Sequence, residues 1–298
     1  MNQSYRSGVA ALLGPPNAGK STLLNRLLQQ KIAIVTPKPQ TTRNRIMGVV
    51  HGENYQIILL DTPGLHEARE EMNRRMVRAA LDTIAEADVV VFLADASAQL
   101  QKDESFTQQL TFLETVQCPV LLALNKVDLM AKTELLPLMD WCQRQYPFSS
   151  IIPLSALRGE GLDILTQELV QRLPEGPQYY PDDMPTDVSE RFIAAEIVRE
   201  TIFLRTRDEI PYSTAVLIDF FDESSVPTRI AATILVERSS QKGILIGKGG
   251  AMLAKIRKQA TAEISQVLER PVRLELWVKV QKNWTEKKDL LKALGLPE

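Results

Sequence analysis

The stretch Gly14-Pro15-Pro16-Asn17-Ala18-Gly19-Lys20-Ser21 decides the fold of the first half of the chain. It fits G-x-x-x-x-G-K-[ST] and stands between an apolar run, Val9–Leu13, and a segment with helical spacing, Thr22–Gln30. Glycines let such a loop curl so that its N–H groups point at phosphate oxygens, and the dipole of the following helix adds to that field. We expect Lys20 to reach the β- and γ-phosphates of a nucleotide and the hydroxyl of Ser21 to ligate magnesium.

Strands and helices alternate along the rest of this half. Apolar runs predict strands at Val9–Leu13, Tyr55–Leu60, Val89–Ala94, Val120–Leu124 and Ile151–Leu154. Helical patterns lie between them, at Thr22–Gln30, Met72–Ala85, Asp103–Thr115, Leu135–Tyr146 and Leu162–Leu173. The alternation predicts an α/β domain with a mostly parallel sheet and helices on both faces.

The second half of the chain has a different order of predicted helices and strands. The breaker-rich stretch from Pro174 to Pro185 marks a linker, so we place one domain at 1–175, the linker at 176–186 and a second domain at 187–298. The second domain reads α-β-β-α-α-β and ends in a charged tail. Its predicted elements are Val188–Leu204, Tyr212–Phe221, Thr228–Glu237, Gln241–Ile246, Met252–Leu268 and Val272–Val280.

Three further motifs, each directly after a predicted strand, indicate that the nucleotide is guanine. Asp61-Thr62-Pro63-Gly64 offers a carboxylate that holds magnesium through water and an N–H that senses a γ-phosphate. In Asn125-Lys126-Val127-Asp128, the Asp128 carboxylate can accept hydrogen bonds from N1–H and the 2-amino group of guanine, donors that adenine lacks. Ser155-Ala156-Leu157 offers the Ala156 N–H to the guanine O6. With the phosphate loop, Thr22 and Thr42, these three motifs complete the expected GTP-binding set.

The polar segment between the phosphate loop and Asp61 is the expected nucleotide sensor. In Pro37-Lys-Pro-Gln-Thr41-Thr42-Arg43, a threonine hydroxyl could reach magnesium when a γ-phosphate is present and leave afterwards. Thr42 is our choice and Thr41 is the near alternative; an ordinary surface loop is the simpler interpretation. The expected metal ligands are Ser21, Thr42 and Asp61.

Hydrolysis by the scheme of Ras-like enzymes is excluded, because the position that carries their water-orienting glutamine is Leu65 here. Asn17 is placed to help hold a monovalent cation, K⁺, against the phosphates in place of an arginine finger. The expected catalytic residues are therefore Lys20, Asn17 and Thr42. His66 is not assigned as a base.

The C-terminal end is basic although the chain carries a formal net charge of only −2. Residues 239–298 hold 12 Lys and Arg against 6 Asp and Glu, whereas the other residues hold 23 against 31. Within this basic end, Ile246-Gly247-Lys248-Gly249-Gly250 matches the Gly-x-x-Gly loop of KH domains, which clamps the backbone of single-stranded nucleic acid. These five residues and Lys242 are the expected RNA-binding set; a plain turn on a solvated basic surface is the alternative.

Composition sets limits on compartment and class. The chain has 298 residues, 44% hydrophobic and 24% charged, and two cysteines, Cys118 and Cys142, too few for a disulfide framework. No apolar run approaches the ~18 residues of a membrane span, and no export signal precedes the first strand. We expect a cytoplasmic protein.

Taken together, these motifs resemble the bacterial Era GTPase family nearly end to end. The resemblance rests on the phosphate loop, Pro-Gln-Thr-Thr-Arg, Asp-Thr-Pro-Gly-Leu, Asn-Lys-Val-Asp, Glu-Arg-Ser-Ser-Gln-Lys, Ile-Gly-Lys-Gly-Gly and Leu-Glu-Leu-Trp-Val-Lys-Val. It implies a slow, cation-assisted, Mg²⁺-dependent GTPase with a type II KH domain. It also implies a monomer that binds GTP, GDP and the 3′ end of 16S ribosomal RNA, assists 30S subunit biogenesis, and touches the inner face of the cell membrane peripherally. The alternative is a constitutive RNA-binding protein whose nucleotide site is only structural.

Overall fold

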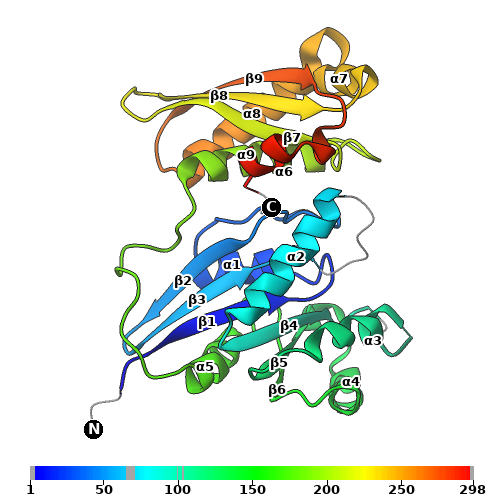
Figure 1. Ribbon diagram of the computed structural model, residues 1–298, viewed down its shortest axis with the longest axis vertical. Helices are drawn as coiled ribbons and strands as arrows, with labels where there is room; N and C mark the ends of the chain where they lie inside the picture. The colour runs from blue at the N-terminus through cyan, green and yellow to red at the C-terminus, as the bar shows by residue number, and fades with distance from the viewer. Residues whose placement is uncertain (1–3, 65–70, 99, 103, 296–298) are drawn as a thin grey trace. The chain divides into compact units, whose positions relative to one another are not determined.

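The structure, a computed structural model, describes residues 4–64, 71–98, 100–102 and 104–295. The described chain divides into two compact units (Figure 1). The N-terminal unit contains residues 4–32, 42–64 and 76–187, and the C-terminal unit contains residues 33–41, 71–75 and 188–295. The short segment 33–41, which stands in sequence between two elements of the N-terminal unit, therefore belongs to the C-terminal one.

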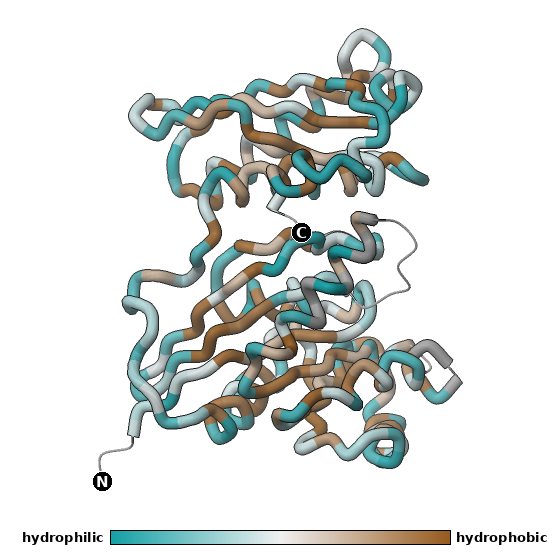
Figure 2. The backbone as a smooth tube through the Cα atoms, in the orientation of Figure 1, coloured by the Kyte–Doolittle hydropathy of each residue, from teal (hydrophilic) through white to brown (hydrophobic). Residues whose placement is uncertain are grey.

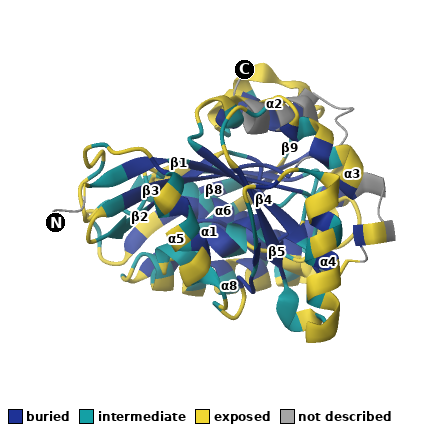
Figure 3. Ribbon diagram, turned by 90° about the horizontal axis from the view of Figure 1, so that it is seen from below, coloured by how far each residue is buried: buried dark blue, intermediate teal, exposed yellow. Residues whose placement is uncertain are grey.

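A six-stranded sheet forms the centre of the N-terminal unit, in the order β2-β3-β1-β4-β5-β6. All neighbouring pairs are parallel except β2 with β3. Figures 2 and 3 show the inner strands as apolar and buried. The strands are β1 (Arg6–Leu13), β2 (Ile46–Gly52), β3 (Tyr55–Asp61), β4 (Val89–Asp95), β5 (Val120–Asn125) and β6 (Ser150–Pro153). The predicted α/β fold with a mostly parallel sheet is confirmed.

Helices cover this sheet. Phe106 of α3 and Leu138 and Cys142 of α4 pack with β1, β4 and β5 in one apolar cluster. The predicted helix Asp103–Thr115 is shorter than expected: α3 ends at Leu110, a 3-10 turn follows, and Asp103 lies outside the described residues. The helices are α1 (Lys20–Leu28), α2 (Glu71–Ala85), α3 (Glu104–Leu110), α4 (Lys132–Gln145) and α5 (Leu162–Arg172), with 3-10 turns η1 (Leu100–Lys102), η2 (Thr111–Leu113) and η3 (Val127–Leu129).

The C-terminal unit packs helices against a three-stranded sheet of order β7-β8-β9, in which β7 is antiparallel and β9 parallel to β8. Buried residues of α6 and α8, such as Ile197 and Ile256, share its core with Ile234 of β8. Its elements are α6 (Glu190–Arg205), β7 (Ala215–Asp222), β8 (Thr228–Val236), α7 (Ser239–Ile246), η4 (Lys248–Gly250), α8 (Ala251–Val267), β9 (Val272–Val280), η5 (Trp284–Glu286) and α9 (Lys288–Ala293). The short helix α9 falls in the stretch we expected to be only a charged tail.

The breaker-rich stretch contains no helix or strand, but it is bonded to the N-terminal unit. The Ser7 N–H donates to Pro174 O at 3.1 Å, and Val49 N–H donates to Pro185 O at 2.8 Å. The buried amide of Gln56 donates to Tyr180 O at 2.8 Å. These bonds give the stretch a fixed course along β1–β3. In the described parts of the chain, no helix combines the length and apolarity that crossing a membrane requires.

Candidate functional site

The loop between β1 and α1 is built around residues with left-handed backbone. Gly14 has φ +137°, and a Cβ there would lie 2.2 Å from Leu93 O; Gly19 has φ +101°, and its Cβ would lie 2.2 Å from Asn125 Nδ2. Both positions therefore require glycine. Asn17 also has a positive φ, of 63°. The loop leads directly into α1, whose first residue is Lys20.

Lys20 is buried and folds back over this loop. Its Nζ donates to the carbonyl oxygens of Gly14 and Pro15, both at 2.9 Å. Burial lowers the pKa of the ammonium to about 8, against the opposing attraction of Asp61. An anion beside Nζ would favour the charged form, so this lysine is suited to receive phosphate.

Three oxygen-bearing side chains meet next to Lys20. Ser21 Oγ donates to Asp61 Oδ2 at 2.6 Å and lies 2.7 Å from Thr42 Oγ1, which is 3.5 Å from the same carboxylate oxygen. Burial raises the pKa of Asp61 to about 6, although Lys20 and the two hydroxyls lower it. Asp61 Oδ1 is buried and has no hydrogen-bond partner among the described residues. Two hydroxyls and an under-satisfied carboxylate are a donor set that suits Mg²⁺.

The hydroxyls of the two candidate threonines, Thr41 and Thr42, have different hydrogen-bond partners. Thr42 joins the oxygen cluster, whereas Thr41 Oγ1 bonds within its own loop, to Thr36 Oγ1 at 2.7 Å and Lys38 O at 2.8 Å. Asp61-Thr-Pro-Gly64 runs beside the phosphate loop: a Cβ on Gly64 would lie 2.8 Å from Pro16 N. Leu65 and His66, on which the expectations about hydrolysis depend, lie outside the described residues.

Asn125 joins the two ends of the site. Its Nδ2 donates to Ala18 O at 2.7 Å and its Oδ1 accepts from Ala156 N–H at 2.9 Å. We expected that N–H to face the guanine O6; here it is committed to Asn125. Asn125 thus ties the phosphate loop to the loop after β6, which makes it an organiser of the site.

Three side chains that hold the loops expected to bind the guanine base, which we call anchors, were not predicted from the sequence. Asp95, at the end of β4, forms an ion pair of 2.6 Å with Lys126, which has a φ of +65°. Arg158 Nε lies 3.4 Å from Asp128 Oδ2, and the Asp128 side chain is only 5% exposed. Arg26 of α1 donates from Nε to Ala156 O at 3.3 Å. Asp95 and Arg26 lie in other elements than the motifs that they hold, and Arg158, which directly follows Leu157, contacts Asp128 of another loop. No spacing rule connects these pairs.

The Gly-x-x-Gly loop lies between α7 and α8 in the C-terminal unit. Gly247, Gly249 and Gly250 have φ of +72°, +58° and +82°, and a Cβ on Gly247 would lie 2.8 Å from Met252 Cβ. Lys248 at its tip is exposed. Gln241 fixes the start of α7, because its Oε1 accepts from the N–H groups of Glu237 and Arg238, both at 3.0 Å.

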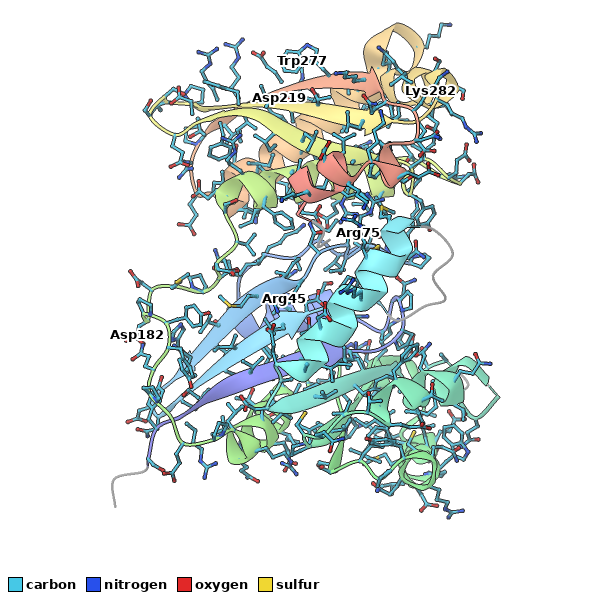
Figure 4. All side chains as sticks on the ribbon, in the orientation of Figure 1. Arg45, Arg75, Asp182, Asp219, Trp277 and Lys282 are labelled. Atoms are coloured by element: carbon cyan, nitrogen blue, oxygen red, sulfur yellow. The ribbon has the colours of Figure 1, made fainter. Side chains whose placement is uncertain are left out.

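A groove of about 1070 Å³ runs along the helix that this loop begins. One wall is α8, with Arg257 and Lys258, and the other is β9, with Trp277 and with Arg273, which forms an ion pair of 3.3 Å with Glu275. Trp277, whose side chain is labelled in Figure 4, is 50% exposed. Cationic side chains beside an accessible indole suit phosphates and stacked bases. None of these four residues was in the expected RNA-binding set.

Comparison with known proteins relates both sites to one family. Residues 9–126 match the family described as 50S ribosome-binding GTPase, and residues 209–285 match the KH domain family. The GTPase Era of Geobacter metallireducens is 50% identical over 293 residues, which cover 98% of each chain. The chain belongs to the Era family of GTPases. The Era of Syntrophus aciditrophicus is 48% identical over 297 residues, covering 99% of this chain and 96% of the relative.

Solved Era structures have the same fold over the whole chain. A variant of Aquifex aeolicus Era bound to GDP and aluminium fluoride is 39% identical, with a TM-score of 0.94, covering 98% of this chain and 100% of that one. A structure of Era in complex with MgGDPNP and nucleotides 1506–1542 of 16S ribosomal RNA has a TM-score of 0.93 at 39% identity and covers 99% and 100%. The predicted combination of a GTPase domain and a KH domain in this family is confirmed.

Proposed function

We propose that this Era-family protein is a GTP-hydrolysing switch that binds the 3′ end of 16S ribosomal RNA and assists 30S subunit biogenesis. The observation that carries the proposal is the pairing, in one chain, of the Ser21–Thr42–Asp61 oxygen cluster with the basic groove beside the Gly247–Gly250 loop. Support comes from a relative of the same fold solved with both MgGDPNP and that part of the RNA.

In the nucleotide site, Lys20 and the loop N–H groups would bind and orient the phosphates. Ser21, Thr42 and Asp61 would hold Mg²⁺, for which the buried Asp61 Oδ1 without a partner among the described residues has acceptor capacity left. The metal, when bound, neutralises phosphate charge. Lys20 delivers a further positive charge from a buried position, where it acts most strongly. Asp128, held by Arg158, would read guanine.

Hydrolysis without the scheme of Ras-like enzymes still needs charge stabilisation of the kind an arginine finger supplies, and we assign it to K⁺ held with the help of Asn17. The left-handed backbone of Asn17 lies in the phosphate loop itself. Hydrolysis by the wild-type protein is expected to be faster in potassium than in sodium, and Asn17→Ala to reduce the difference, in single-turnover assays. Equal rates in both salts would exclude this assignment.

Guanine selectivity is expected to depend on Asp128. Asp128→Asn replaces an acceptor with a group that also donates, so GTP affinity is expected to fall about tenfold to a hundredfold while affinity for xanthosine triphosphate rises. The measurement is nucleotide competition, with Asp163→Asn, an exposed acidic residue of α5, as the matched control. An unchanged preference for GTP in the Asp128 variant would contradict the assignment.

In the C-terminal unit, Ile246–Gly250 would clamp the RNA backbone, with Lys242 and Lys248 adding charge. The groove residues Arg257, Lys258, Arg273 and Trp277 extend that surface. We further propose a monomer in the cytoplasm with peripheral membrane association, as the family resemblance implies. The second candidate function, constitutive RNA binding with a structural nucleotide site, is favoured by Leu65 alone, since leucine cannot orient water.

A further inference from the structure

Segment 33–41 belongs to a different structural unit from the elements that flank it in sequence. In sequence it joins α1 to β2, both elements of the N-terminal unit, yet it belongs to the C-terminal unit. The chain returns to the N-terminal unit at Thr42, the residue whose hydroxyl contacts Ser21 and Asp61. The peptide bond between Thr41 and Thr42 is therefore where one unit ends and the other begins.

Helix α6 of the C-terminal unit holds the main chain of this segment. Val35 N–H donates to Glu200 Oε1 at 2.8 Å. Arg199 Nη2 donates to Thr41 O, and Lys38 Nζ donates to the carbonyl oxygens of Phe203 and Thr206 at the end of α6. Two of the three anchors act on the backbone of the segment, so they fix its course whatever its side chains are.

The side chains that α6 contributes to these contacts, together with Glu196, which pairs with Arg199, are charged and buried. Glu196, Arg199 and Glu200 are 9%, 2% and 3% exposed. Arg199 Nε donates to Glu196 Oε1 at 2.7 Å, and the guanidinium lies 5.3 Å above the Phe203 ring. Burying such charges contributes little to stability compared with apolar residues of the same volume. A cluster of this kind is better explained by the position of segment 33–41 than by the packing of α6.

The Thr41 carbonyl couples this geometry to the nucleotide site. It shares one rigid peptide plane with the N and Cα atoms of Thr42, so the contact with Arg199 fixes the point from which the Thr42 side chain projects. Arg199 Nη1 is buried and has no hydrogen-bond acceptor among the described residues. A buried guanidinium with an unused donor can accommodate a second position of the segment, which a two-state element requires.

We propose that Arg199 and Glu200 are positioning residues that hold segment 33–41 so that Thr42 reaches the magnesium site. Through these two residues, the contacts of α6 with the segment would depend on whether the Thr42 hydroxyl is bound at that site. This inference rests on the proposed function. GTP, but not GDP, would favour the engaged position of Thr42, and the segment would transmit that difference to the RNA-binding unit. The effect on affinity must be reciprocal, so RNA would alter the preference for GTP over GDP by the same factor.

Glu200→Met tests the proposal most directly, because it removes the acceptor for Val35 N–H. We expect single-turnover GTP hydrolysis to fall at least about tenfold, since misplacing a reacting group by 1 Å can cost about a hundredfold. The ratio of RNA affinities measured with a GTP analogue and with GDP is expected to move towards one. Affinity for GDP, which has no γ-phosphate, is expected to stay within about twofold of the wild type.

Three variants control this experiment. Glu200→Gln retains a carbonyl oxygen that can accept from Val35 N–H, so it is expected to restore both readouts. Lys38→Met acts from the segment side without touching the buried charges, and it is expected to change both readouts in the same direction even if Glu200→Met does not fold. Arg191→Met changes an exposed arginine of α6 that bonds Ile218 O, away from the segment, and is expected to resemble the wild type.

The outcomes separate this inference from the proposed function. A wild-type protein that neither hydrolyses GTP nor binds the RNA would overturn the proposed function. Wild-type activity together with unchanged hydrolysis and an unchanged affinity ratio in both Glu200→Met and Lys38→Met would overturn only the positioning role. Equal losses in Glu200→Gln and Glu200→Met would also overturn it, because the acceptor would then be irrelevant.

Discussion

Replacing Lys20 with alanine is expected to reduce single-turnover GTP hydrolysis by about 10²–10³-fold, the typical loss when one preorganised electrostatic contact is removed. The Lys20 ammonium is buried among the Gly14 and Pro15 carbonyls, so no water can substitute for it fully. Ser21→Ala is expected to have a loss of the same order, because it removes a hydroxyl from the oxygen cluster around Asp61.

The control for this result is Leu65→Ala, which removes an apolar side chain from the position where Ras-like enzymes carry glutamine. It is expected to cost far less, since leucine supplies no polar group to the chemistry. Thermal unfolding and GDP affinity of each variant would show whether the fold is intact. If Leu65→Ala were as inactive as Lys20→Ala, our inference that Leu65 plays no part in orienting the attacking water would be wrong.

The double change Lys248→Asp and Gly249→Asp is expected to abolish specific RNA binding while GTP hydrolysis persists. Lys248 is exposed, and a Cβ on Gly249 would meet nothing within 4 Å, so the substitutions place like charge where phosphate is expected without a steric clash. For the wild type, the logarithm of affinity is expected to fall with the logarithm of salt concentration, with a slope of about −3 if four phosphates are contacted.

Filter binding to the 16S 3′ end, to an unrelated single strand and to a duplex measures this effect. Gly249→Asn is the matched control, because asparagine tolerates the left-handed backbone of Gly249 (φ +58°) and adds no charge. Equal affinity of the wild type for all three ligands, unaffected by the double change, would leave only a non-specific attraction of the basic surface.

The strands that carry the motifs were predictable from sequence, because each motif follows a continuous apolar run. Strand β2 was missed. Its residues Ile46-Met-Gly-Val-Val-His include a glycine, Gly48, which interrupts the apolar run and packs closely against Leu28 of α1. The antiparallel edge of the sheet follows from this strand alone.

The site was predictable as far as local motifs extend, and no further. Lys20, Ser21 and Asp61 meet as expected because parallel strands end at one edge of the sheet. The partners Asp95 and Arg158 could not be found, since each depends on which loops the sheet order brings together. From the sequence, Trp277 is only one residue of the predicted strand Val272–Val280. It becomes part of a groove because α8 lies beside that strand.

The most direct test of the switch is the affinity of the intact protein for the 16S 3′ end, measured with GDP and with a non-hydrolysable GTP analogue at one salt concentration. When two sites are coupled, the ligand at one site typically changes the affinity at the other by about 5- to 150-fold. We predict a difference within that range, with the analogue-bound protein binding more tightly. Equal affinity in the two nucleotide states, from a protein that binds both nucleotides, would contradict the account and support constitutive RNA binding.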